Sequence, residues 1–193
     1  MTRRGRLFCT SRPYRGLARA AVLPWALQGE TLTGHVLEIG SGSGAMAAAL
    51  LDLFPQVQHL VATDYDERMV AAATTSLQRY GDRAVVERAD ATSLRFENNT
   101  FDAVCSFAML HHVLRWEDAL REAVRVLKPG GRLLGYDILG NRAMLALHGD
   151  KDDTRMIRPG ELTQCLTRLP VDFRVHQLPT AIAGRFVVTK RAT

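Results

Sequence analysis

The sequence predicts an α/β fold in which a mostly parallel sheet carries helices on both of its faces. Three observations support this class. Short apolar segments alternate with segments of helical periodicity along most of the chain. The segment Phe101–Phe107 is almost continuously apolar, as expected for a parallel strand that is covered on both sides. A glycine-rich turn, Gly40–Gly44, joins the first apolar segment to a helical one, which is how such folds form a crevice for a nucleotide.

Seven segments have the length and the apolar character of strands. The last two lie close enough in sequence to pair as an antiparallel edge of the sheet. Right-handed crossovers between the parallel strands bring the carboxyl ends of the first, second, fourth and fifth strands to one rim, where a ligand is expected. The expected strands are His35–Ile39, His59–Thr63, Ala84–Glu87, Phe101–Phe107, Arg132–Ile138, Val171–Leu178 and Arg185–Lys190.

Five segments are expected to be helical. The clearest is Trp116–Leu127, whose apolar residues recur at the spacing of one helix face. The dipeptide Gly81-Asp82 ends the helix before it, and Pro129 with its two following glycines turns the chain into the fifth strand. The expected helices are Tyr14–Leu27, Gly44–Leu53, Asp66–Tyr80, Trp116–Leu127 and Pro159–Leu169.

The charge of the chain is unevenly distributed. The 193 residues suffice for one domain, and 47% hydrophobic residues with a mean hydropathy of −0.07 indicate a globular protein. Residues 1–19 contain six arginines and no acidic residue, whereas the remainder carries 19 basic and 20 acidic residues. The body of the chain therefore offers no broad surface for nucleic acid. We expect residues 1–30 to form an Arg-rich tail with a short helix, and residues 31–193 to form a single domain.

The amino-terminal tail has three interpretations: a targeting peptide, a segment that docks on anionic lipid or nucleic acid, or a solvated tail. The third is favoured, because Arg19 and Pro24 interrupt the apolar stretch that an export signal needs. No run approaches the ~20 apolar residues that span a bilayer. Cys9, Cys105 and Cys165 are far apart and form no C-x-x-C motif, which indicates reduced thiols. We expect a cytoplasmic monomer or homodimer.

The turn after the first strand holds the strongest signal for a ligand. Its glycines alone leave the ligand open, since Gly40 and Gly42 also fit the dinucleotide pattern G-x-G-x-x-G/A. Glu38 stands two residues before the first glycine, inside an otherwise apolar strand. A carboxylate is costly to bury there unless it meets a cationic or donor-rich partner.

Acidic residues also follow the second and third expected strands. Asp64 can accept hydrogen bonds from the hydroxyls of a ribose, or it can cap the next helix, although Asp66 is the better candidate for a cap. Tyr65 can flank an adenine or simply pack. Asp90 can accept from an adenine amino group, with the amide of Ala91 aimed at a ring nitrogen, or it can be a solvated loop residue.

Four segments together resemble one family. They are E-x-G-x-G-x-G at Glu38–Gly44, F-D-x-V at Phe101–Val104, L-H-H at Leu110–His112, and L-R-E-x-x-R-V-L-K-P-G-G at Leu120–Gly131. These resemble the methyltransferase type 11 family of class I S-adenosylmethionine (SAM) dependent enzymes, over about half of the chain. The resemblance implies a Rossmann-like class I methyltransferase fold, SAM as the cofactor and a small-molecule methyl acceptor. It also implies that the helix before residue 30 covers the cofactor pocket as a lid.

The resemblance assigns parts of SAM to motif residues. The glycine loop wraps the methionine end, Asp64 binds the ribose, and Asp90 with Ala91 binds the adenine. Ser106 and Phe107 lie near the sulfonium, whose positive charge the negative field of Glu38 favours. The implied cofactor-binding residues are Glu38, Gly40, Ser41, Gly42, Gly44, Asp64, Tyr65, Asp90, Ala91, Ser106 and Phe107.

The catalytic residues are less defined. Methyl transfer mainly needs alignment and exclusion of water, and a general base only where the acceptor must lose a proton. His111 and His112 are candidate bases because histidine titrates near neutral pH, and the alternative is that they only order the loop. His111 is the first choice, since the second histidine of the motif is common in the family. Asp137, at the end of the fifth strand, can orient an acceptor or cap the segment that follows.

Alternative functions remain open from the sequence. One is an NAD(P)-dependent oxidoreductase, against which the Leu127–Gly131 signature argues. Another is a non-catalytic binding or regulatory module that keeps the fold. The acidic cluster at His148 and Asp150–Asp153 is expected to be a solvated loop rather than a metal site, because Lys151 interrupts it and no regular element fixes its spacing.

Overall fold

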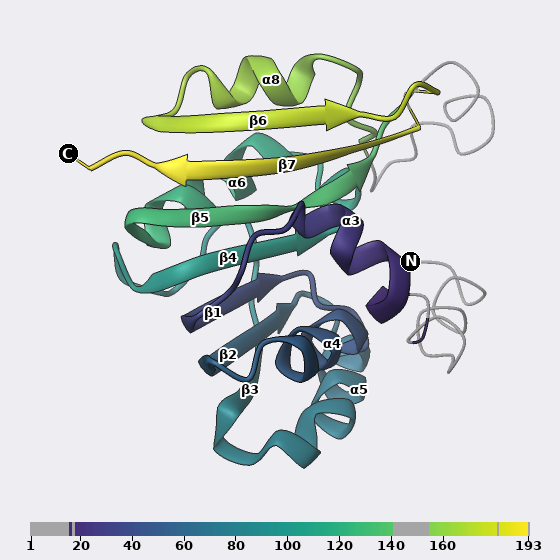
Figure 1. The fold of residues 1–193 in the computed structure, drawn as a ribbon, viewed down its shortest axis with the longest axis vertical. Coiled ribbons are helices and arrows are strands. Elements are labelled where there is room, and N and C mark those ends of the chain that lie inside the picture. Colours follow the sequence, from purple (N-terminus) through teal and green to yellow (C-terminus); the bar gives the residue numbers. More distant parts are fainter. Residues whose placement is uncertain (1–15, 17, 141–154, 181, 193) are drawn as a thin grey trace.

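The computed structural model describes residues 16, 18–140, 155–180 and 182–192. Its centre is a seven-stranded sheet in the order β3-β2-β1-β4-β5-β7-β6 (Figure 1). All neighbouring pairs among β1 to β5 are parallel, whereas β7 runs antiparallel to both β5 and β6. The strands are β1 (Gly34–Ile39), β2 (Val57–Asp64), β3 (Ala84–Arg88), β4 (Phe101–Phe107), β5 (Leu127–Ile138), β6 (Val171–Gln177) and β7 (Ala183–Lys190).

The predicted fold class is confirmed, with one detail of the edge corrected. β6 and β7 pair antiparallel, as expected from their closeness in sequence. The strand that opposes the rest of the sheet is β7, which lies one place in from the edge, so that the edge strand β6 runs in the common direction. The carboxyl ends of β1, β2, β4 and β5 share one rim, because these strands are parallel neighbours.

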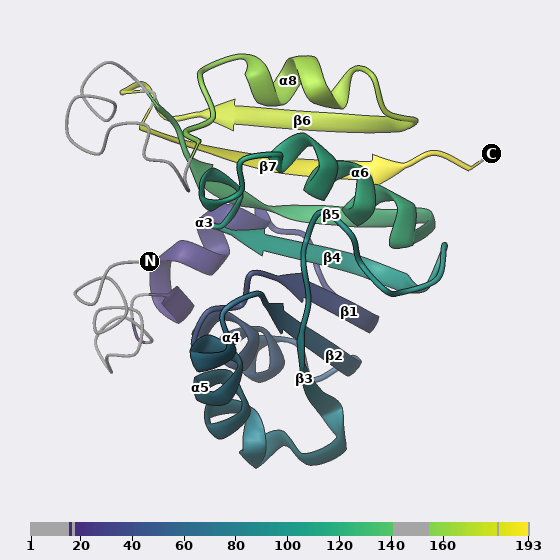
Figure 2. The ribbon, with the colours of Figure 1, turned by 180° about the vertical axis from the view of Figure 1, so that it is seen from behind.

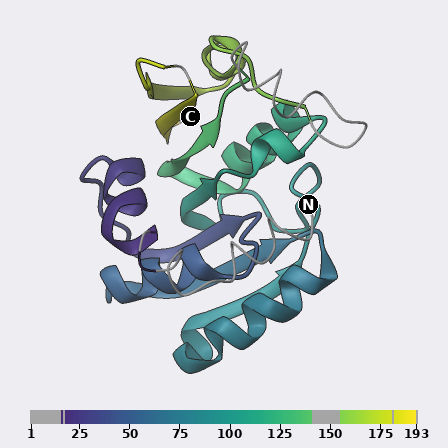
Figure 3. The same ribbon diagram turned by 90° about the vertical axis from the view of Figure 1, so that its right-hand side faces the viewer.

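Two apolar cores form on the two faces of the sheet, because alternate residues of a strand point to opposite sides. On β1, Val36 belongs to the core with α3 (Leu23–Leu27) and α4 (Ala45–Leu53), whereas Leu37 belongs to the core with α6 (Trp116–Val126) and α8 (Glu161–Leu166). Figure 2 shows α6 and α8 from behind, and Figure 3 shows the purple α3 and the teal α6 on opposite sides of the sheet. The helices predicted on both faces are thus present.

The ends of several helices differ from the predicted ones. The amino-terminal helix divides into a π-helical turn, η1 (Ala18–Val22), and α3, and the start predicted at Tyr14 lies outside the described residues. Pro24 has no N–H to donate to the fourth preceding carbonyl, which explains why a regular α-helix does not run through this point. The helix α5 (Glu67–Leu77) begins after Asp66, whose side chain accepts from the amide of Arg68 at 2.9 Å, so the predicted N-cap is confirmed.

Three further bounds differ. The short helix η2 (Gln78–Arg83) continues the chain after α5, which ends before the predicted Tyr80. The strand β5 begins at Leu127, five residues early, because Leu127 pairs with Phe101 before an irregularity in the register. The helix α8 is shorter than predicted and follows Gly160. The predicted division at residue 30 remains a prediction.

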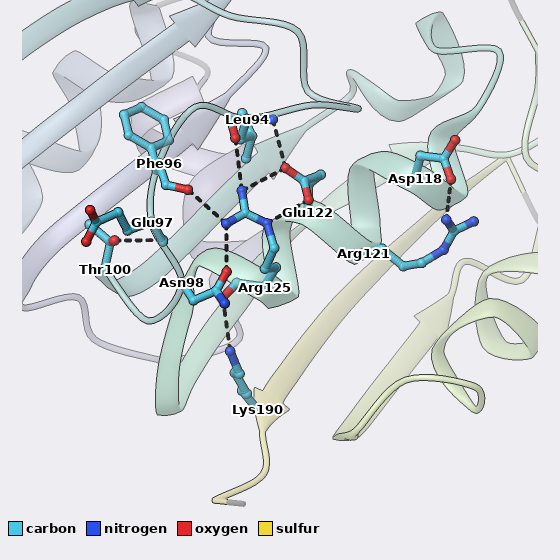
Figure 4. Close-up of polar contacts among 10 residues, drawn as sticks. All are labelled: Leu94, Phe96, Glu97, Asn98, Thr100, Asp118, Arg121, Glu122, Arg125 and Lys190. Carbon is cyan, nitrogen blue, oxygen red and sulfur yellow. Dashed lines mark hydrogen bonds and ion pairs between the residues drawn. The ribbon is translucent and has the colours of Figure 1, made fainter.

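A cluster on α6, which we call the clamp, fixes the connection between β3 and β4 (Figure 4). Arg125 donates to both carboxylate oxygens of Glu122, at 2.7 and 2.8 Å. The same guanidinium donates to the carbonyls of Leu94 and Phe96 and to Asn98, at 2.8 to 2.9 Å. The amide of Leu94 in turn donates to Glu122 at 2.8 Å. This stretch has no helix of its own, so the clamp supplies partners for its backbone.

Candidate functional site

The glycine loop between β1 and α4 has a backbone that only glycine adopts readily. Gly40, Gly42 and Gly44 have φ values of +68°, +55° and +74°. A Cβ on Gly40 would lie 1.8 Å from Cγ of Met109, so the segment after β4 packs directly against the loop. A Cβ on Gly42 would meet nothing within 4 Å, so this residue faces open space. The loop therefore rests on the protein at Gly40 and offers its backbone to a ligand at Gly42.

Asp64 ties the glycine loop to the end of β2. Its carboxylate accepts from the amide of Gly42 at 2.8 Å and from the amide of Asp66 at 3.0 Å. The amide of Ser41 donates to the carbonyl of Thr63 at 2.8 Å. Burial raises the pKa of Asp64, and the bonds from Asp66 and Gly42 oppose this shift. Since Asp66 is the cap of α5, the interpretation of Asp64 as the cap is wrong, and Asp64 instead supports the loop.

Three buried oxygen atoms at this rim have no hydrogen-bond partner: Glu38 Oε2, Ser41 Oγ and Ser106 Oγ. We call these three residues the cradle. Their exposed fractions are 1%, 6% and 0%. Glu38 lies on β1 and Ser106 on the neighbouring β4, but the register pairs Ser106 with Ile39, so the side chains of Glu38 and Ser106 leave opposite faces of the sheet. Among the described residues, the only other buried side-chain nitrogen or oxygen atoms without a partner are the nitrogens Gln28 Nε2 and Trp116 Nε1. Buried polar atoms without partners are rare and costly, so the cradle is a candidate place for the polar groups of a ligand.

Glu38 has the most perturbed carboxyl group of this site. Burial, and then the nearby charge of Asp64, raise the pKa of Glu38 to about 8, while the backbone amide of Ala47 lowers it. Cys105 stands opposite Glu38 on β4, and burial raises the pKa of its thiol well above the usual value. Cys105 is completely buried, as a residue that packs in the core.

The residues predicted to bind adenine lie together beyond β2 and β3. The amide of Ala89 donates to the carbonyl of Asp64 at 3.1 Å, which joins the two strand ends. Tyr65 is 66% exposed, and the Arg88 guanidinium lies 5.3 Å from its ring centre. One oxygen of Asp90 accepts from Thr92, from its amide at 2.8 Å and from its hydroxyl at 2.7 Å. Asp90 thus shapes its own loop.

Aromatic side chains form a wall beside the cradle. Phe107, which is buried, has its ring centre 6.1 Å from that of Tyr136, and Tyr136 meets Trp25 of α3 edge-on at 5.4 Å. Arg185 of β7 donates to the carbonyl of Trp25 at 2.8 Å. The helix α3 is therefore attached to the sheet through buried Leu23 as well as through Trp25. Its role as a lid remains a prediction.

His111 is bound to a buried carboxylate. Its Nδ1 lies 2.6 Å from Oδ1 of Asp137, which is fully buried, while the histidine side chain is 10% exposed. Asp137 also accepts from the amides of Leu110 and Ile138, at 2.6 and 2.7 Å. A ring that donates from Nδ1 to a carboxylate keeps Nε2 as a proton acceptor. The sequence offered Asp137 only as a cap or as an acceptor-orienting group, and missed this pairing. The signal for this pairing was that His111 follows β4 and Asp137 lies at the end of β5, two neighbouring strands whose carboxyl ends share one rim.

His112 differs from its neighbour. Its ring centre lies 4.0 Å from that of His111, but its residue is exposed. The carbonyl of His111 accepts from the amide of Arg155 at 3.1 Å, which brings the segment before α8 to this loop. His111 is thus the buried, oriented member of the pair.

A hollow of about 590 Å³ lies between α6 and α8, apart from the cradle. Its charged residues pair with one another, as Arg155 does with Glu117 at 2.8 Å and Arg115 with Asp118 at 3.2 Å. Within the described ranges, no group of three or more His, Cys, Asp or Glu residues could hold a metal ion. The acidic cluster considered from the sequence lies outside those ranges. Among the helices that the structure describes, none is long and apolar enough to cross a membrane.

Comparison with known proteins gives a family match. The model of a family described as methyltransferase domain matches residues 37–135. The ubiquinone/menaquinone biosynthesis C-methyltransferase UbiE of Pseudomonas fluorescens (strain Pf0-1) is 38% identical over 110 residues. This match covers 56% of the chain and 43% of the relative. The demethylmenaquinone methyltransferase of Clavibacter sepedonicus is 37% identical over 100 residues, which cover 52% of the chain and 39% of the relative. The chain therefore spans under half the length of these relatives.

Solved structures show the same fold at low sequence identity. A SAM-dependent methyltransferase from Aquifex aeolicus has a TM-score of 0.73 at 18% identity, covering 98% of each chain. The cyclase SpnF has the same TM-score and identity, covering 93% of this chain and 82% of its own. Since a protein named as a cyclase shares the fold, the fold alone does not determine the reaction.

Proposed function

Because this chain belongs to the family of methyltransferase domains, we propose that it transfers a methyl group from SAM to a small-molecule acceptor. The observation that carries the proposal is the cradle, in which three buried oxygen atoms await polar or cationic partners. When bound, SAM supplies a methyl group on a positively charged sulfur. A buried carboxyl and two hydroxyls suit that charge better than the pyrophosphate of NAD, which is an anion and would face Glu38.

The chain's own residues divide the binding between them. Glu38 and Ser41 receive the methionine end, Ser106 lies near the sulfonium from the end of β4, and Gly42 lets the ligand approach the backbone. Asp64 holds the amide of Gly42 and still has lone pairs for ribose hydroxyls, because a carboxylate has about four acceptor sites. Tyr65 and the Asp90–Ala91 loop border the space for the adenine.

His111 serves as the general base. Asp137 fixes the ring through Nδ1, so Nε2 can take a proton from an acceptor hydroxyl and pass it to solvent. Loss of that proton makes a phenol oxygen, and the ring carbons beside it, more nucleophilic. The aromatic wall of Trp25, Phe107 and Tyr136 suits a flat ring. We therefore propose a hydroxylated ring compound as the acceptor, and the relatives named as C-methyltransferases of quinone biosynthesis support this class.

Calorimetry tests the cofactor. SAM and S-adenosylhomocysteine should bind the wild type, NAD should not, and Asp64→Ala should weaken SAM binding at least tenfold. A wild type that binds no SAM would contradict the proposed function, and binding of NAD in its place would favour the oxidoreductase alternative. Tight SAM binding without transfer to any acceptor would favour a non-catalytic module.

Methyl transfer to catechol and to 1,4-naphthohydroquinone tests the base. The His111→Ala variant should lose at least a hundredfold in kcat below pH 8, because general bases contribute about 10²–10⁴-fold. His112→Ala is the matched control and should stay within threefold of the wild type. An unchanged pH profile in His111→Ala would remove His111 from the mechanism.

A further inference from the structure

Glu38 is a buried carboxyl group for which the surrounding protein supplies no cation. Its residue is 1% exposed on the inner strand β1. The register places Ala62 of β2 on one side and Cys105 of β4 on the other. From α4 the backbone amide of Ala47 reaches the carboxyl, and from β2 the charge of Asp64 acts on it. Among the described residues, no Lys, Arg or His forms an ion pair with Glu38.

Asp137, the other buried carboxyl group of this rim, has more hydrogen-bond partners than Glu38. It accepts from two backbone amides and pairs with His111. Glu38 has one oxygen, Oε2, with no partner at all. For Glu38 the single donor, the amide of Ala47, does not offset burial, and desolvation penalises the charged form, so the carboxyl group is most stable when it is protonated. The surroundings of Glu38 therefore favour its protonated form.

We propose that Glu38 is a proton-linked selector for the cationic methyl donor. It keeps its proton while no cation is bound, and it releases that proton to solvent when a positively charged sulfonium occupies the cradle. The O–H bond of the carboxyl breaks, the proton passes to the buffer, and the carboxylate remains beside the cation. The product has a neutral thioether in place of the sulfonium and keeps only its α-ammonium group as a cation, so its binding releases less proton. This inference rests on the proposed function, since the cation is that of SAM.

The pKa of about 8 agrees with this assignment. At that value about nine-tenths of Glu38 is protonated at pH 7 and about one-tenth at pH 9. Binding of SAM should therefore release about 0.9 proton at pH 7 and about 0.1 at pH 9. The apparent affinity for SAM should correspondingly increase about tenfold between pH 7 and pH 9.

Calorimetry in buffers of different ionisation enthalpy counts these protons. Glu38→Gln should remove the release and the tenfold gain, while Glu87→Gln, which changes an exposed carboxylate of β3, should keep both. Comparison with Glu38→Gln also subtracts the titration of SAM itself. In the wild type, S-adenosylhomocysteine should release clearly less proton than SAM.

The outcomes separate this inference from the proposed function. Binding of SAM with no more proton release than in Glu38→Gln would overturn the selector and leave the methyltransferase proposal standing. Equal release with both ligands would also overturn it. Absence of SAM binding would remove the function as well. Should Glu38→Gln not fold, infrared difference spectra of the wild type at pH 7 give the answer. A protonated-carboxyl band should disappear when SAM is added, and a spectrum without that loss would contradict the proposal.

Discussion

The cradle contains buried polar groups and the clamp contains partly buried charged groups, and the two obtain their partners differently. In the clamp, Arg125 and Glu122 satisfy each other and the backbone of the β3–β4 connection. In the cradle, Glu38, Ser41 and Ser106 keep oxygen atoms without partners. The pKa values follow this difference. The hydrogen bond from Arg125 lowers the pKa of Glu122, whereas burial raises that of Glu38. Polar groups that stabilise the fold are paired within it, and those that serve a ligand are left incomplete.

The largest expected effect is the loss, in Glu38→Gln, of the pH dependence that Glu38 gives to the stability of the wild type. The pKa of Glu38 rises from 4.5 in the unfolded chain to about 8 in the fold, so the unfolded state binds fewer protons between these values. The wild type should therefore lose stability from pH 4.5 to pH 8, by up to about 5 kcal/mol relative to a residue that cannot titrate. Glu38→Gln should be more stable than the wild type at pH 8 and similar to it at pH 4.5.

Urea unfolding of the ligand-free protein at several pH values measures this difference. A free energy of unfolding of Glu38→Gln below that of the wild type at pH 8 would contradict the distinction between cradle and clamp. Such a result would mean that Glu38 stabilises the fold, as the clamp does.

A substitution in the clamp should lower the free energy of unfolding, whereas Glu38→Gln should raise it at pH 8. Arg125→Ala leaves the Glu122 carboxylate and the carbonyls of Leu94 and Phe96 without donors, and should reduce the free energy of unfolding by about 2–3 kcal/mol. The matched control is Arg121→Ala on the same helix, which removes an exposed pair with Asp118 (Figure 4). That change should cost less than about 1 kcal/mol.

The folded fraction of Arg125→Ala should still bind SAM within threefold of the wild type. Equal destabilisation by the two arginine changes would show that the clamp is no more than a surface ion pair.

The smallest effect distinguishes two glycines that have the same φ. Gly42 and Gly81 both have a φ of +55°, and a Cβ on either would meet no atom within 4 Å. Replacement by Ala should cost each about 1–3 kcal/mol of stability because of the positive φ, and more at Gly81, whose ψ of −136° lies outside the left-handed helical region. Only Gly42→Ala should also weaken SAM binding, by about tenfold, because its methyl group enters the open side of the loop. Calorimetry measures the affinity of both variants for SAM. Equal affinities in the two variants would mean that the ligand does not bind next to Gly42.

Much of the fold followed from local patterns. The apolar stripe of Trp116–Val126, the cap Asp66 and the strand β4 are properties of neighbouring residues, so periodicity and capping chemistry predicted them. The early start of β5 depends on pairing with Phe101, and the π-helical turn depends on the missing donor of Pro24. A strand's pairing partner arises from tertiary structure and is absent from the sequence pattern, whereas Pro24 is visible in the sequence and was interpreted only as an interruption of an apolar stretch.

The candidate site was predictable to a different degree in its two halves. The glycine loop and Asp64 are local motifs, and the structure brings them together through the amide of Gly42. The pair of His111 and Asp137 spans 26 residues and depends on ring orientation, so its parts were predicted separately and its contact was not. The Leu120–Gly131 segment that carried much of the family resemblance builds the clamp instead. Lys128 there binds Asp102 at 2.7 Å. A signature can thus identify a family through residues that hold the fold.

The inner position of β7 constrains the order in which the sheet can assemble. β6 is synthesised before β7, yet its hydrogen-bonded neighbour in the sheet is β7. Until Ala183–Lys190 has been made, the outer edge of β5 has no strand beside it, and β6 has nowhere to attach. An unpaired strand edge is a template for association with other chains. A ribosome-bound chain that has not yet completed β7 would thus be the form most in need of a chaperone.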